Sequence, residues 1–119
     1  MKPTALVAAL FLPVAASAQQ AVDIGSGAVL RGLDKVDGQT TDMELEQGGA
    51  TEIGRLRVEL RQCRYPAGAP ASDAFAYLVI RDAETGIELF SGWMVASSPA
   101  LNALEHPRYD VWVLRCKTG

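Results

Sequence analysis

The chain has 119 residues, 49% of them hydrophobic, with 11 basic and 14 acidic side chains for a net charge of −3. A chain of this length forms one domain around one core and is too short for two. Its mild acidity, without a basic patch, makes nucleic acid and anionic lipid poor partners. Phosphate-binding, calcium-loop and zinc-ligand spacings are all missing, so we expect neither a cofactor nor a metal.

The first 18 residues have the features of a secretory signal peptide. Lys2 gives a cationic start, residues 5–14 are apolar, and residues 16–18 (ASA) form a small-residue cleavage site. The apolar stretch is shorter than the roughly 20 residues that a membrane-spanning helix needs. We therefore expect cleavage after Ala18 and a periplasmic mature protein without a membrane span of its own.

Residues 19–27 are polar and contain a Gly-Ser-Gly sequence, which predicts a flexible lead-in with little to bury. The pattern then changes to alternation, and Asp37-Gly38 between two alternating runs predicts a β-hairpin. Further on, RLRVELRQC (55–63) has the period of two that is typical of a half-buried strand. FAYLVIRDA (75–83) is apolar on both parities, which predicts a central strand covered on both faces.

These runs and the turn signals between them indicate an all-β fold. We expect residues 28–119 to form a single β-domain, a small antiparallel β-sandwich or barrel of roughly six to seven strands.

The two cysteines, Cys63 and Cys116, should form one disulfide in an oxidising compartment. Strict alternation along residues 55–63 would place Cys63 on the polar face of its strand. Either a bulge near Gln62 shifts the register or the disulfide lies at the margin of the sheet, and both interpretations stay open.

Residues 90–116, FSGWMVASSPALNALEHPRYDVWVLRC, hold both tryptophans and the only histidine. A serine hydrolase would need a triad, for which the candidates are Ser97 or Ser98, His106 and Asp110. The glycine-flanked elbow that commonly carries a nucleophilic serine is missing. We therefore expect no catalytic residue here and keep a small periplasmic serine hydrolase as an alternative.

The middle of this stretch favours a short helix instead. Ser98 directly before Pro99 is typical of a helix N-cap and first helical position. Leu101 and Leu104 would then lie on one helix face, and Pro107 would end the helix. The sequence thus predicts one short helical insert between two strands, docked by two leucines.

Trp93 and Trp112 have two interpretations. Large aromatic residues often lie in a sandwich core, here beside the disulfide, but an exposed aromatic patch can also bind a partner. Trp93 is the better interface candidate because Gly92 leaves the backbone accessible and Met94 adapts to varied surfaces. The candidate interaction surface consists of Gly92, Trp93, Met94, Ser97 and Ser98.

The carboxy-terminal run quoted above, together with LRGLDKVDG (30–38) and Cys63, resembles an uncharacterised alphaproteobacterial family of exported proteins, domain of unknown function 2155. The resemblance extends from about Ala28 to Lys117, while Val95 and Arg115 depart from the family pattern. It implies no activity. Genes of the family often lie near one for an accessory subunit of respiratory complex I, which implies a role at the periplasmic face of that complex or in its assembly.

Taken together, these observations predict a non-enzymatic exported interaction domain. Its partner would be another periplasmic or inner-membrane protein, with the complex I role as the more specific expectation. A serine hydrolase and a cell-wall glycan binder that uses the aromatic side chains are the alternatives.

Overall fold

The computed structural model describes residues 21–119, so the predicted signal peptide at residues 1–18 lies outside the described residues. The described part of the chain is all-β and contains eight strands: β1 (Val22–Ile24), β2 (Gly27–Asp34), β3 (Thr40–Glu46), β4 (Ala50–Ile53), β5 (Leu56–Pro66), β6 (Phe75–Asp82), β7 (Glu88–Val95) and β8 (Tyr109–Lys117). The predicted count of six to seven was too low, because β1 and β4 have only 3 and 4 residues.

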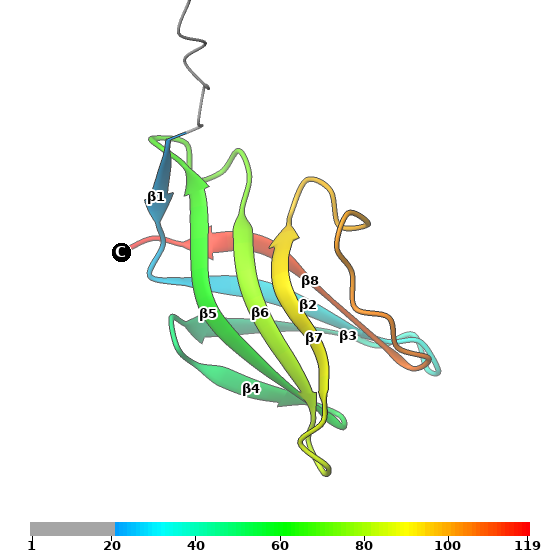
Figure 1. Ribbon diagram of the computed structural model, residues 1–119. Coiled ribbons are helices and arrows are strands. Elements are labelled where there is room, and N and C mark those ends of the chain that lie inside the picture. The colour runs from blue at the N-terminus through cyan, green and yellow to red at the C-terminus, as the bar shows by residue number, and fades with distance from the viewer. Residues whose placement is uncertain (1–20) are drawn as a thin grey trace, which may run out of the picture.

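The strands form two antiparallel sheets that pack face to face. Sheet A has the order β1-β5-β6-β7, with β4 paired to the first half of β5, and sheet B has the order β3-β2-β8. The strands of the two sheets cross one another rather than running side by side (Figure 1). The fold is therefore a sandwich of two sheets.

The alternation along β5 and the apolar character of β6 explain sheet A. Leu56, Val58 and Leu60 are fully buried against sheet B, while Arg57 on the opposite face is exposed. The central position of β6 is confirmed, since it pairs with β5 on one side and β7 on the other. The prediction that β6 is covered on both faces is wrong, because no further layer of the described residues covers its outer face, where Phe75 and Tyr77 are half-buried and only Val79, at 4% exposed, is buried.

The core lies between the sheets and draws on both of them. Sheet B contributes Leu30 and Val111, among others, to the layer that packs on β5 and β6. Among the described residues, the buried side chains are all hydrophobic: Ala28, Val29, Leu30, Met43, Leu45, Leu56, Val58, Leu60, Cys63, Ala74, Ala76, Leu78, Val79, Ile80, Met94, Leu104, Tyr109, Val111, Val113 and Cys116.

The predicted disulfide is confirmed, and two β-bulges make it possible. In β5 the pairing with β6 skips Arg61, and in β8 the pairing with β2 skips Leu114. Each skipped residue reverses the parity of its strand, so that Cys63 and Cys116 both face inward. Their Cα atoms are 5.7 Å apart, and the bond joins sheet A to sheet B. Of the two interpretations, the bulge near Gln62 is the correct one.

Residues 19–27, expected to be a flexible lead-in, contain β1 and the passage from sheet A to sheet B. The three residues of β1 are exposed but pair with β5. Gly25 is buried, and its amide donates to the carbonyl of Cys63 at 2.8 Å. A Cβ atom at Gly25 would lie 2.8 Å from the carbonyl oxygen of Lys117, so glycine serves close packing at this crossing.

The predicted helical insert is wrong. Residues 96–108, which we call the strap, contain turns and extended chain but no helix, and run from the end of β7 to the start of β8 (Figure 1). The Leu101 amide donates to the Ser98 carbonyl at 3.0 Å, a turn that does not continue, so Ser98 and Pro99 cap no helix. Leu104 is buried whereas Leu101 is 75% exposed. A helix of so few residues is marginal without tertiary support, and only one of its leucines reaches the core.

Candidate functional site

The two tryptophans lie on opposite outer faces of the sandwich. Trp93 extends from β7 on the outer face of sheet A, and Trp112 from β8 on the outer face of sheet B; both are half-buried. The interpretation that they pack in the core is wrong, since neither belongs to the buried set. Met94 is 3% exposed and faces the core, so Trp93 is the member of the Gly92-Trp93-Met94 segment that faces outward.

Trp93 belongs to a group of contacting side chains that spans three strands. It lies directly opposite Tyr77 of β6, with ring centroids 5.3 Å apart in an edge-to-face arrangement. The guanidinium of Arg64 from β5 lies 4.9 Å from the Trp93 ring centroid, a cation–π contact. Phe75 and Val95 form the adjacent cross-strand pair. We call Arg64, Phe75, Tyr77, Trp93 and Val95 the aromatic face.

Polar contacts hold the members of this group in place. The Nε of Arg64 donates to Oε1 of Gln62 at 2.6 Å, and the Tyr77 hydroxyl shares a 3.1 Å hydrogen bond with Ser91. Both partners come from the same strands as the stacked side chains, so strand pairing fixes the whole arrangement. Such side chains lose little further freedom when a partner binds.

The strap secures the β7 edge beside Trp93. Asn102 of the strap donates through Nδ2 to the carbonyl oxygen of Trp93 at 3.0 Å. Gly92 has φ +156° and faces inward, and a Cβ there would lie 2.8 Å from Asn102 Nδ2. Gly92 thus leaves room for the Asn102 side chain, which occupies one hydrogen-bonding position of an otherwise open sheet edge.

The two serines of the predicted surface lie beyond the end of β7. Ser97 is exposed, and its hydroxyl donates to Asp73 Oδ2 at 2.8 Å while its amide donates to Asp73 Oδ1 at 3.0 Å. Ser98 is half-buried, and its amide donates to the Val95 carbonyl at 3.1 Å. These contacts join the strap to the loop before β6, and they leave Trp93 as the aromatic part of the predicted surface.

The residues of the suggested triad are bonded elsewhere. Nδ1 of His106 accepts hydrogen bonds from the amides of Arg108 and Tyr109, at 3.0 and 3.1 Å. Asp110 accepts from the amide of Val111, its neighbour in the chain. Within residues 21–119, no hydrogen bond joins His106 to a serine or to Asp110.

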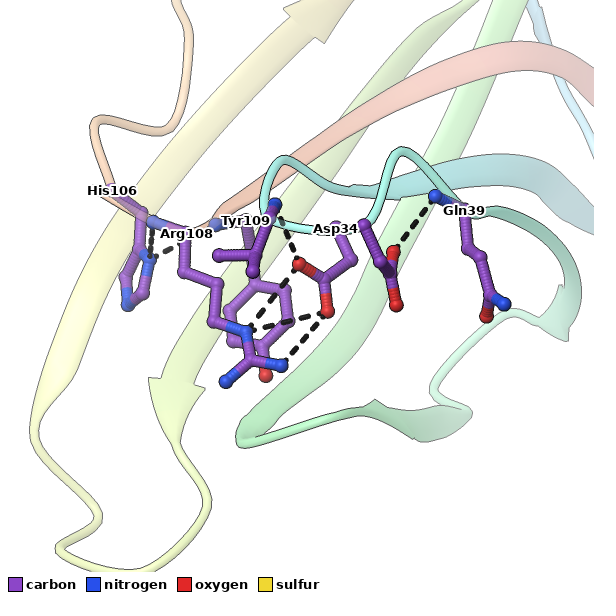
Figure 2. Close-up of polar contacts among 7 residues, drawn as sticks. Asp34, Gln39, His106, Arg108 and Tyr109 are labelled. Atoms are coloured by element: carbon purple, nitrogen blue, oxygen red, sulfur yellow. Dashed lines mark hydrogen bonds and ion pairs between the residues drawn. The ribbon is translucent and has the colours of Figure 1, made fainter.

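His106 belongs instead to a polar cluster that connects the strap to the β2–β3 turn (Figure 2). Arg108 forms an ion pair with Asp34 at 3.0 Å, and Lys35 donates through Nζ to the carbonyl of His106 at 2.9 Å. The Arg108 guanidinium, followed by the Val36 amide, holds the pKa of Asp34 below its usual value of 3.8. This cluster joins the two sequence runs that carry the family resemblance, LRGLDKVDG and the carboxy-terminal run.

Two hollows lie beside the carboxy-terminal half of β8. Their volumes are about 220 and 370 Å³, and both are lined by Pro70, Ala71 and Arg115. In the smaller one the polar groups include Ser97 and Asp73, which bond to each other. Neither contains an aromatic side chain.

Residues 21–119 contain no group of three or more His, Cys, Asp or Glu residues that is arranged to hold a metal ion. The same residues contain no helix long and apolar enough to cross a bilayer.

Sequence reasoning identified Trp93 but missed its neighbours Arg64 and Tyr77. Tyr77 lies in the run 75–83 that predicts a strand, whereas Arg64 follows the run 55–63, and regular alternation beyond that run would turn Arg64 inward. What the sequence lacks is the register that brings Arg64, Tyr77 and Trp93 together across three strands. Asn102 and Asp73 were missed because they act across loops.

Fold and site together define a class of protein: a small two-sheet β-sandwich joined by one disulfide, with an aromatic cluster on the outer face of one sheet. The chain belongs to the family described as uncharacterized protein conserved in bacteria, DUF2155, whose model matches residues 28–116. It is also 26% identical over 87 residues to the Uncharacterized protein RP359 of Rickettsia prowazekii (strain Madrid E). That match covers 71% of this chain and 56% of the relative. No solved structure matches the chain.

Proposed function

We propose that this protein is a non-enzymatic, exported interaction domain that binds another periplasmic or inner-membrane protein through its aromatic face. The observation that carries the proposal is the position of Trp93, half-buried on the outer face of sheet A and held by Arg64 and Tyr77. Tryptophan, tyrosine and arginine are the residues most enriched where interfaces concentrate their binding energy.

The opposite outer face supports this choice by contrast. On the outer face of sheet B, the Arg31–Asp42 pair at 2.7 Å lies beside Trp112, and the Lys117–Glu46 pair at 2.6 Å lies at the far end of the same strands. These charged groups already have partners and would have to be desolvated on binding, which is unfavourable at the centre of an interface. The aromatic face carries less charge and rigid rings, so its burial costs less.

The family resemblance suggests which partner to look for. Its association with an accessory subunit of respiratory complex I makes that inner-membrane complex, or an intermediate in its assembly, the first partner to test. The periplasmic location follows from the predicted signal peptide at residues 1–18 and remains part of the proposal.

The proposal can be tested by affinity capture from mild-detergent extracts of native membranes, followed by quantitative mass spectrometry. We expect stoichiometric partners with the wild-type chain and their loss with Trp93→Ala. Trp112→Ala is the matched control, because it removes a tryptophan that is also half-buried but lies on the opposite face. Partners that remain with Trp93→Ala, or a chain recovered only as a free monomer, would contradict the proposal.

Two further assays separate the alternatives. A fluorophosphonate probe that labels Ser97 or Ser98 would indicate a serine hydrolase and overturn the non-enzymatic part of the proposal. Binding to purified peptidoglycan that disappears with Trp93→Ala would assign the aromatic face to cell-wall glycan instead of a protein.

A further inference from the structure

We infer that the aromatic face is built to receive a carboxylate of the partner protein, an Asp or Glu side chain with apolar neighbours, and that Arg64 binds it. This inference rests on the proposed function and specifies the chemistry of the partner surface.

Three arginines in residues 21–119 are half-buried. Arg31 pairs with Asp42 at 2.7 Å, and Arg81 lies 3.8 Å from Glu88. Arg64 is half-buried like the other two, yet it forms no ion pair with any described residue. A partly desolvated guanidinium is normally paired with an acid, so Arg64 is the exception on this molecule.

The geometry around Arg64 leaves its carboxylate-binding groups available. Its Nε donates to Gln62, and its guanidinium is held against the Trp93 ring, which in turn contacts Tyr77. The Nη atoms make no hydrogen bond to any other described residue. A planar guanidinium has five N–H donors, so most of the fork remains free to bind a carboxylate through two hydrogen bonds.

The surroundings define the rest of the partner surface. Ile24 of β1, which is 58% exposed, lies opposite Arg64 in the sheet, and Phe75 lies opposite it on the other side. The outward acid nearest along β5, Glu59, is bound to Arg61 at 3.2 Å. The site is therefore positively charged with an apolar border, and its complement is one acidic residue flanked by apolar side chains.

A direct test uses the full mature chain, labelled with ¹⁵N, and two blocked tripeptides. Acetyl-Leu-Glu-Leu-amide is the probe and acetyl-Leu-Gln-Leu-amide its uncharged control, each titrated to about 10 mM because so small a ligand binds weakly. We expect the acidic peptide to shift the Arg64 Nε and Trp93 indole signals with saturation, and at least about tenfold weaker binding of the neutral one.

Three variants locate the effect. Arg64→Gln should weaken binding of the acidic peptide by about tenfold, and Arg64→Lys should not restore it because lysine lacks the planar fork. Arg57→Gln is the matched control, since Arg57 is also an outward arginine of β5 without an ion pair and should leave binding unchanged. Thermal melts of each variant verify folding.

Equal binding of both peptides, Arg64 signals that do not move, or full binding by Arg64→Lys would overturn the inference. The membrane capture described above distinguishes its failure from that of the proposed function. Partners lost with Trp93→Ala but retained with Arg64→Gln would leave the interaction domain standing without a carboxylate contact. Partners retained with Trp93→Ala would reject the interaction surface itself.

Discussion

The two outer faces of the sandwich present the same kinds of residue in opposite arrangements. On sheet A, Arg64 lies against Trp93 and has no acidic partner among the described residues. On sheet B, Arg31 lies opposite Trp112 in the strand register but is bound to Asp42 through two hydrogen bonds. On each face a half-buried arginine lies beside the tryptophan, and the faces differ in whether that arginine is already paired with an acid.

This difference teaches that an aromatic residue on a sheet surface does not by itself mark an interface. Trp112 lies beside the Arg31–Asp42 ion pair, which stabilises the fold only a little. Trp93 lies beside a charge whose hydrogen bonds are incomplete. Whether the neighbouring arginine is paired with an acid therefore distinguishes the two faces better than the exposure of the tryptophan does.

The largest expected effect on stability comes from removing the disulfide that joins the two sheets. Replacing both Cys63 and Cys116 by serine should cost about 4 kcal/mol of unfolding free energy, because the closed loop spans 53 residues. Urea and thermal unfolding of the double variant measure this, and dithiothreitol should reproduce it in the wild type. An unchanged midpoint would show that the sheets hold together without the bond.

A smaller loss of stability is expected from the strap, which contributes the Leu104 side chain to the core. Leu104 is 4% exposed, so Leu104→Ala should destabilise the protein by about 2–4 kcal/mol. Leu101, which is 75% exposed, is the control, and its replacement by alanine should change stability by less than about 0.5 kcal/mol. If both variants lowered the unfolding midpoint equally, the result would contradict this prediction and favour a helix that packs through both leucines.

Double-mutant cycles compare the two arginines directly. We expect the Arg64–Trp93 cycle to give a coupling energy of about 0.5–1 kcal/mol that changes little with salt. The Arg31–Asp42 coupling should shrink in 1 M NaCl, because exposed ion pairs are screened. A strongly salt-dependent Arg64–Trp93 coupling would indicate that a carboxylate of this chain pairs with Arg64 after all.

The smallest effect is a difference in pH response. A hydrogen bond from Arg31 holds the pKa of Asp42 below its usual value of 3.8. The pair therefore stabilises the fold fully above that value, and the contribution is lost as the pH falls through the lowered pKa. The Arg31 Nε signal should follow this titration while Arg64 Nε does not, as pH-dependent nuclear magnetic resonance spectra would show. If the Arg31 and Arg64 Nε signals titrated alike, the two faces would not differ in the pairing of their arginines.

Much of the fold could be predicted because local patterns agree with the tertiary structure. The period of two along residues 55–63 predicts β5, and Asp37-Gly38 predicts the turn between β2 and β3. The family resemblance was also correct. β1 and β4 were missed because strands of 3 and 4 residues are too short to show a period.

The errors have one physical source, namely contacts between segments far apart in the sequence. Ser98-Pro99 is a good helix start, but the strap bonds to β7 through Asn102 and buries only Leu104. Regular alternation along β8 would place Cys116 on the same side as Trp112, and the skipped residue Leu114 reverses that order. The pairing of Arg64 with Trp93 depends on strand register, which no local pattern contains.

The two bulges keep the cysteines facing each other although each strand holds one extra residue. The pairing of β5 skips Arg61 and that of β8 skips Leu114, so Cys63 and Cys116 both face inward. Deleting Arg61 would remove the bulge and leave Leu60, Gln62 and Cys63 in regular alternation, so Cys63 would still face inward and the disulfide would still close. Pairing Arg61 in regular register instead would turn Cys63 toward water and leave two thiols that can cross-link to other molecules.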